Sequence, residues 1–474
     1  MNEDTSIPEE VQINAWTGTE APVSGLAKPS AWASRASRKG SAGGKLAPAE
    51  IDLRQWQNED VGWGIILPDD ETIPANLRHT AAGAPDCIQQ LVTQRGDAPV
   101  FRFNAAAPTG FLFRYDKAGN RTAPLMDAGA KRGRRTGDLP WYLLIVGGPD
   151  IIPWWVQYHL NLIAFTGRLA LSEPALENYV AALMTNWRGS AARRQHPVIW
   201  SVDQGQPDIT WLMTQTVANE LEKSYIGDAE VGATKLKRLT KEMASGSALA
   251  TALAAERPAL IVTTSHGKTG PIASPGAMLE QLGVLVDANG VALEYTDMLG
   301  QWSPDGAIWY AHACCSAGSD STSRFVDLVP AGTSVQRVLA AVAALGAHVA
   351  PMPTALLGAS KPLKAFIGHV EPTFDWTLRD TRNKQVLTSG IVSALYSELF
   401  LANPVPVGMA FQSVFSTVAG QQNIANLKRA EAVDLAKREA ATKEMVRAQL
   451  LAHDRQNIVI LGDPTVALPA NNRT

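Results

Sequence analysis

Short, mostly apolar runs separated by stretches with helical spacing restrict the fold of this chain more than any other feature. The runs lie at Tyr142–Val146, Pro197–Val202, Pro258–Thr264, Ala307–Ala313, Lys364–Gly368 and Ile458–Leu461. Helical spacing lies between them, at Glu173–Trp187, Thr210–Lys223, Lys235–Glu256, Val335–Leu345, Gly390–Leu401 and Asn423–His453. Parallel strands joined by helical crossovers are buried on both faces, which requires such apolar runs. The sequence therefore predicts an α/β fold with a mostly parallel central sheet and helices on both faces.

Composition suggests three segments. Residues 1–50 are rich in Ser, Gly, Pro, Lys and Arg and show no apolar period, which is typical of a flexible leader. Residues 51–190 are expected to form an N-terminal α/β subdomain with an exposed basic loop at 116–139, and residues 191–470 a second, larger domain. The polar stretch RGSAARRQH at 188–196 is the predicted boundary between them.

Charge and cysteine content exclude several functional classes. The net charge of −3 argues against a nucleic-acid or membrane-surface binder, because both need a basic field. The acidic start MNEDTSIPEE lacks the features of a secretory signal, so a cytoplasmic protein is expected. Cys87, Cys314 and Cys315 are too few for a disulfide framework or a zinc site, and neither a metal nor an organic cofactor is expected.

Two of the predicted strands end in residues suited to nucleophilic catalysis. One strand is followed by Ser265, His266 and Gly267, and another by the sequence ACCSAG, which contains Cys314. Ligands bind beyond the carboxyl ends of parallel strands, so the two side chains face one crevice if the strands are neighbours. An imidazole can take the proton of a thiol and later protonate a leaving amine, while backbone N–H groups beside small residues can bind an oxyanion.

The order of these pieces resembles that in the caspase-like cysteine peptidases, in particular their bacterial branch related to gingipains and CHAT proteases. The resemblance rests on SHG at 265–267 and ACCSAG at 313–318. Supporting pieces are YLLIVGGPDIIPWWVQYHL from 142, AFIGHVEP from 365 and IVILGDP from 458. It implies a caspase-like fold and a cysteine endopeptidase that cleaves protein or peptide substrates. Cys314 would be the nucleophile, His266 the base, and the N–H groups of Gly267 and Cys314 the oxyanion donors. The second thiol, at position 315, departs from most relatives and leaves open which cysteine attacks, although family spacing favours Cys314.

The resemblance also suggests a substrate pocket and a form of regulation. His312 occupies a pocket position where metacaspase-like members carry Asp; Ser265 and Asp320 are further pocket candidates, and Glu371 and Asp375 could add an acidic wall. Many relatives prefer a basic residue before the scissile bond, and the same preference is expected here. A zymogen is expected, switched on by an activating protease or a regulatory partner in a bacterial stress or defence pathway, and calcium activates some relatives. The basic loop is a candidate processing site, at Arg132, Arg134 or Arg135.

Other interpretations remain at this stage. A cysteine at the end of an apolar strand is commonly core packing, and a catalytically inactive caspase-like scaffold that binds partner proteins is the main alternative function. A non-peptidase thiol hydrolase or acyltransferase could use the same dyad. The sequence HGKTG resembles the end of a phosphate-binding loop, but the glycine that such a loop requires is replaced by Val262.

Overall fold

The computed structural model describes residues 10–18, 21–25, 51–107, 112–122, 129–380, 382–401 and 403–470. Ten strands of this part of the chain form one central sheet. In spatial order they are β11 (Lys237–Thr240), β10 (Val198–Ser201), β12 (Leu260–Thr264), β15 (Ile308–His312), β18 (Ala365–His369), β19 (Ile458–Gly462), β9 (Phe165–Leu169), β8 (Tyr142–Val146), β4 (Trp63–Pro68) and β5 (Val100–Phe103). The chain is therefore an α/β protein with a mostly parallel sheet, as the sequence predicts.

The sheet consists of two parallel halves that meet at one antiparallel pair. β11, β10, β12, β15 and β18 are mutually parallel, and so are β19, β9, β8, β4 and β5. β18 and β19 pair antiparallel along their full length, from Ala365 opposite Gly462 to His369 opposite Ile458. Strands formed early and late in the chain thus belong to one continuous sheet, and a division near residue 190 stays a prediction.

Helices cover the sheet, and every residue of β8, β9, β10, β12, β15, β18 and β19 is buried. One contiguous row packs as α7 (Gly246–Glu256), α9 (Tyr295–Gln301), α11 (Pro351–Gly358), α3 (Ala175–Met184) and α1 (Asp86–Gln94). A second group joins α4 (Ile209–Met213), the π-helical turn η2 (Thr214–Ala218), α5 (Asn219–Gly227), α6 (Gly232–Lys235), α12 (Ser389–Ser393), the π-helical turn η6 (Ala394–Glu398), α13 (Val407–Ala410) and α14 (Gln412–Glu431). The remaining α-helices of the described residues are α2 (Trp154–Leu160), α8 (Pro275–Glu280), α10 (Ser334–Ala343) and α15 (Arg438–Gln456).

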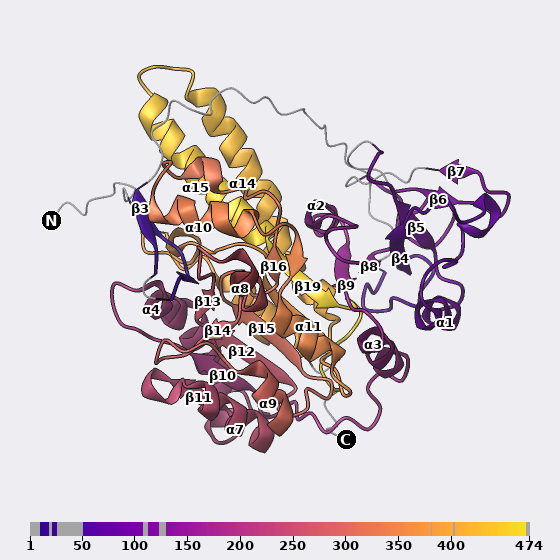
Figure 1. Ribbon diagram of the computed structural model, residues 1–474, viewed down its shortest axis with the longest axis horizontal. Coiled ribbons are helices and arrows are strands. Elements are labelled where there is room, and N and C mark those ends of the chain that lie inside the picture. Colours follow the sequence, from indigo (N-terminus) through magenta and orange to yellow (C-terminus); the bar gives the residue numbers. More distant parts are fainter. Residues whose placement is uncertain are drawn as a thin grey trace.

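Three predictions from the sequence need correction. The expected helix at 235–256 contains a strand, β11, before α7, because β11 adds its backbone to the edge of β10. The expected helix at 423–453 is a hairpin of α14 and α15, whose contact buries Ala425, Met445 and Ala448 (Figure 1). The turn at 432–437 contains neither Gly nor Pro, so the sequence offers no signal for it.

The third correction concerns the leader. Of residues 1–50, the structure describes 10–18 and 21–25, which include strands β1 (Glu10–Gln12), β2 (Ala15–Trp16) and β3 (Val23–Gly25). Positions 1–9, 19–20 and 26–50 lie outside the described residues. β3 lies beside α10, on the opposite side of the molecule from β4 and β5 (Figure 1). This N-terminal segment therefore lies beside a helix from much later in the chain and away from β4 and β5, which follow it in the sequence.

β2 belongs to a small sheet at the carboxyl end of the main one. It pairs in parallel with β13 (His266–Lys268), which pairs antiparallel with β14 (Leu285–Val286). Two further short pairs are β16 (Gly318–Ser319) with β17 (His348–Val349), and β6 (Arg114–Tyr115) with β7 (Arg121–Thr122). β13 of this small sheet contains His266, the predicted catalytic base.

Candidate active site

His266 and Cys314 follow neighbouring strands. β12 and β15 pair in parallel with Thr264 opposite His312, so both strands reach the same edge two residues before the predicted dyad. A Cβ atom built on Gly267 would lie 1.9 Å from the carbonyl oxygen of Cys314 and 2.9 Å from its backbone nitrogen. Only a residue without a side chain permits this approach. The two segments that the sequence singled out are therefore in backbone contact.

A carboxylate that the sequence analysis did not identify binds the histidine. Asp208 precedes α4, and its oxygens lie 3.0 and 3.1 Å from Nε2 of His266. The same carboxylate accepts hydrogen bonds from the backbone N–H and the hydroxyl of Thr210. Burial raises the pKa of Asp208, but the hydrogen bond and charge of His266 and the bonds from Thr210 outweigh it, so the pKa lies below its ordinary value. Asp208 is therefore ionised near neutral pH.

This carboxylate determines which imidazole nitrogen can act as a base. An ionised carboxylate only accepts hydrogen bonds, so the proton of a neutral His266 ring lies on Nε2. Nδ1 is buried and has no hydrogen-bond partner among the described residues. The lone pair on Nδ1 is then free to accept a proton. The ring of Trp16, from β2, lies against the imidazole with a centroid distance of 5.5 Å.

The two adjacent thiols are fully buried. Sγ of Cys314 lies 3.4 Å from Sγ of Cys315, and within the described part of the chain no hydrogen bond joins Cys314 to His266. Burial, the neighbouring thiol and Glu371 raise the pKa of Cys314 well above its ordinary value. Cys315 has a φ of +53°, a left-handed conformation that is unusual without glycine and that is retained mainly at functional or tightly constrained sites. The raised pKa keeps the thiol of Cys314 protonated in this closed arrangement.

Residues of the N-terminal segment contribute to this burial. Val11, Ile13 and Ala15 belong to the same apolar cluster as the two cysteines. The carbonyl oxygen of Asn14 accepts a hydrogen bond of 3.0 Å from the N–H of Gly267, one of the two predicted oxyanion donors. A polypeptide backbone thus lies against the N–H group that a substrate carbonyl is expected to use.

The predicted pocket residues are mostly enclosed. His312 is fully buried between the hydroxyl of Tyr310, 2.8 Å from Nδ1, and Oγ1 of Thr373, 3.3 Å from Nε2. Burial and the neighbouring His369 lower the pKa of His312 well below its ordinary value, so the ring is neutral. Ser265 is also buried, and its hydroxyl donates to the carbonyl oxygen of His266.

The three acidic pocket candidates differ in their surroundings. Burial raises the pKa of Asp320, and it raises those of Glu371 and Asp375 to about 7. Glu371 accepts a hydrogen bond from the Asn457 amide. Asp375 accepts one of 3.3 Å from the N–H of Gln12, so the N-terminal segment covers it. These groups do not form an open, fully charged acidic wall in this arrangement.

The predicted processing loop is partly held in place. Arg132 donates to the carbonyl oxygen of Ile163 and stacks on Trp141, and Arg134 donates to the carbonyl oxygen of Gly96. Arg135 remains 69% exposed beside Asp60. Arg135 is therefore the most accessible of the three candidates, and cleavage there stays a prediction.

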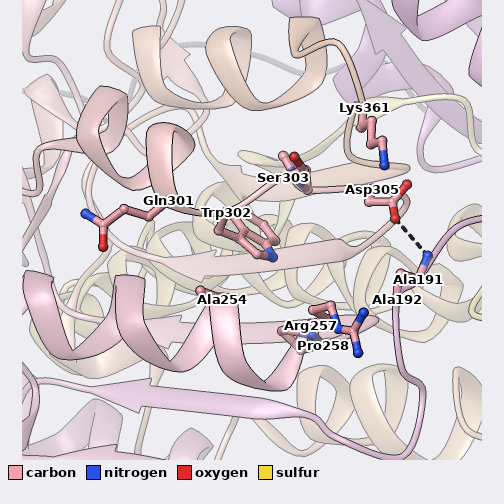
Figure 2. A pocket seen from close by; sticks show the side chains of 11 residues that line it. Ala191, Ala192, Ala254, Arg257, Pro258, Gln301, Trp302, Ser303, Asp305 and Lys361 are labelled. Atoms are coloured by element: carbon pink, nitrogen blue, oxygen red, sulfur yellow. Dashed lines mark hydrogen bonds between the residues drawn. The ribbon is translucent and has the colours of Figure 1, made fainter.

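A cavity of about 260 Å³ lies at the amino ends of β12 and β15, beside the residues that precede these strands. It is lined by Arg257 and Pro258, by residues 301–305 and by Lys361 (Figure 2). Asp305 spans its rim by accepting a 2.7 Å hydrogen bond from the N–H of Ala191. Because the cavity faces the amino ends of the strands, it is separate from the histidine and cysteine.

Comparison with family models, with curated proteins and with solved structures finds no match. In the described part of the chain, no helix is both long and apolar enough to cross a bilayer. Likewise, the described residues contain no group of three or more His, Cys, Asp or Glu placed to hold a metal ion.

Buried histidines near the site predict sensitivity to acid. Burial lowers the pKa of His369 to about 3, whereas in the unfolded chain it is about 6.5. Below pH 6.5 the unfolded chain binds a proton that the folded chain does not, so stability present above pH 6.5 is lost as the pH falls towards 3. From pH 7 to pH 5, the unfolding free energy of His369→Leu should fall by about 2 kcal/mol less than that of the wild type. Urea unfolding at both pH values measures this difference, and parallel losses in the two proteins would contradict it.

Proposed function

We propose that the chain is a caspase-like cysteine endopeptidase with Cys314 as nucleophile, His266 as base and Asp208 as positioning residue. The observation that carries the proposal is the contact of Gly267 with the backbone of Cys314, beside a histidine whose Nε2 is bound by a carboxylate. A thiol and an oriented imidazole at neighbouring strand ends, with a backbone N–H donor of Gly267 between them, are the groups that acyl transfer needs.

The proposed reaction has two halves, acylation and deacylation, and His266 accepts and returns a proton in each. Nδ1 of His266 takes the proton of Cys314, and the sulfur forms a bond to the carbonyl carbon of the substrate. The oxygen becomes negative and accepts hydrogen bonds from the N–H groups of Gly267 and Cys314. The C–N bond breaks as His266 returns the proton to the leaving amine. Water then attacks the thioester carbonyl and gives one proton to His266. The C–S bond breaks to release the acid, and His266 returns the proton to the sulfur of Cys314.

A partner-binding scaffold without activity is the second candidate. The buried, protonated thiol and its hydrogen bond to Cys315 favour it, because a working nucleophile must ionise and reach a substrate. The two candidates differ in the role of His266. A peptidase needs its imidazole to deprotonate Cys314, whereas a binding scaffold does not.

A thiol-reactive probe distinguishes the two. We expect iodoacetamide to label Cys314, and His266→Ala to slow that labelling at least about tenfold, because the base that helps the thiol ionise is lost. Mass spectrometry of peptides after timed labelling measures the rate at each cysteine. The partly exposed Cys87 is the internal control, and its rate should not change. Labelling of Cys314 that is slow and independent of His266 would favour the scaffold.

A further inference from the structure

Residues 12–17 cross the candidate site as an extended strand. Before Asn14, the segment pairs antiparallel with the residues after β18, through a bridge between Ile13 and Phe374. After Asn14, it pairs in parallel with β13, with Ala15 opposite Gly267, and the N–H of Thr269 donates to the carbonyl oxygen of Trp16. Asn14 therefore lies where the strand passes from one wall of the site to the other. An extended peptide bound by backbone pairing to strand edges is a common mode of peptide recognition.

The backbone of Asn14 makes the contacts expected of the residue before a scissile bond. Its carbonyl oxygen receives the N–H of Gly267 at 3.0 Å, and its own N–H donates to the carbonyl oxygen of Thr373 at 3.3 Å. Gly267 in turn touches the backbone of Cys314. The carbonyl oxygen of Asn14 thus accepts a hydrogen bond from one of the two N–H groups that the proposed mechanism assigns to the reacting carbonyl.

The side chain of Asn14 is fully buried and matched to its surroundings. Oδ1 accepts a hydrogen bond of 3.0 Å from the N–H of Thr373, and Nδ2 points to the sulfur of Met213 at 3.9 Å. An N–H donor on one side and a thioether acceptor on the other fit a carboxamide, which has one acceptor and one donor end. A carboxylate here would place an unpaired charge beside the sulfur, and an arginine or lysine would direct N–H donors at the N–H of Thr373.

We infer that this subsite selects asparagine before the scissile bond, and that the chain's own residues 12–17 occupy it as a tethered peptide. The inference rests on the proposed function, and it replaces the basic preference that the family resemblance implies. A substrate must displace the segment to bind, so the closed form also limits access to Cys314.

The test uses the full chain and peptidyl ketone probes that differ only in the residue that enters this subsite: Asn, Asp, Gln, Ala or Arg. In Asn14→Ala, which loses the carboxamide contacts, we expect Cys314 to react about tenfold faster with every small thiol reagent than in the wild type. Among the probes, the Asn probe should react at least tenfold faster than the Arg probe. Glu10→Ala changes an exposed residue just before residues 12–17 and should behave as the wild type.

A peptide competitor gives a second measurement, which shows whether faster labelling in Asn14→Ala comes from an open site in a folded protein or from unfolding. The nonapeptide EVQINAWTG, which reproduces residues 10–18, should slow labelling of Cys314 in Asn14→Ala, and EVQIRAWTG should not. A new amino terminus at Ala15 in the wild type that is absent from Cys314→Ala would also support the inference, because the segment would then be the first substrate.

The outcomes separate the inference from the proposed function. If the Arg probe reacts with Cys314 as fast as the Asn probe or faster, the asparagine subsite is wrong while the cysteine peptidase stands. If Cys314 reacts with the probes but Asn14→Ala and the competitor change nothing, the segment does not occupy the subsite. If neither probes nor reagents show a His266-dependent reaction at Cys314, both proposals fail.

Discussion

Cys314→Ala is expected to reduce peptide cleavage by at least about 10⁴-fold, because the nucleophile is lost and only the binding and oxyanion contacts remain. The measurement is the cleavage rate of the fastest peptide from a mixed library, with the full-length chain. Alanine removes one sulfur atom from a buried position, so the fold should survive with an unfolding free energy about 1–2 kcal/mol lower. The catalytic loss should therefore appear in a folded protein.

The neighbouring thiol provides the matched control for that experiment. Cys315 is equally buried, and its Sγ lies 3.4 Å from that of Cys314, so Cys315→Ala creates a comparable cavity. We expect Cys315→Ala to keep cleavage within about tenfold of the wild type, because the proposed chemistry does not pass through this sulfur. Loss of cleavage in Cys315→Ala with retention in Cys314→Ala would show that the other cysteine attacks.

Asp208→Asn is expected to lower kcat roughly 10³-fold to 10⁴-fold with little change in KM. The amide of Asn can donate to Nε2 of His266, which moves the ring proton to Nδ1 and removes the base. Asn remains a good residue for the start of a helix, so the bond to the N–H of Thr210 and the beginning of α4 should persist. Steady-state kinetics of the wild type and the variant measure the separation of kcat from KM.

A second aspartate in the same loop controls for a merely structural effect. Asp203 accepts a hydrogen bond from the N–H of Gly205 and does not contact His266. Asp203→Asn should keep both kcat and KM near the wild type. A proportional loss of activity in both variants, or a change in KM alone in Asp208→Asn, would argue against a role for Asp208 in holding the imidazole.

The sequence predicted strands that contain a run of apolar residues, such as β8, β12 and β15, but it missed β4, which is also apolar. It did not predict β5 and β9, because each contains a buried arginine that breaks the apolar pattern. The guanidinium of Arg102 in β5 donates to the carbonyl oxygens of residues 68, 78, 80 and 82, and that of Arg168 in β9 donates to Gln157 and to Gly147. These contacts satisfy a buried charge in the fold, but they join segments that a periodicity analysis treats separately.

The residues of the candidate site were likewise only partly predictable from the sequence. His266 and Cys314 could be found because strand ends and small residues are visible in the sequence, and the parallel pairing of β12 and β15 brings them together. Asp208 could be recognised only as a helix start, since its partner lies 58 residues further along. Asn14 carried no signal, because its partners Gly267 and Thr373 come from distant strand ends that exist only after folding. In the leader, β2 forms by pairing with β13, whereas β1 and β3 pair with each other.

The position of β19 has a consequence for how the protein assembles. β19 comes later in the chain than the other nine strands of the sheet, yet it separates β18 from β9. A nascent chain that has been synthesised only as far as α15 would carry two unfinished half-sheets, each with an unpaired edge open to aggregation. Joining them depends on contacts between residues about 300 positions apart, such as Ile460 with Gly167, and contacts of such high order slow folding. Chaperone protection during translation is therefore expected to matter more for this chain than for a sheet that grows outward from its first strands.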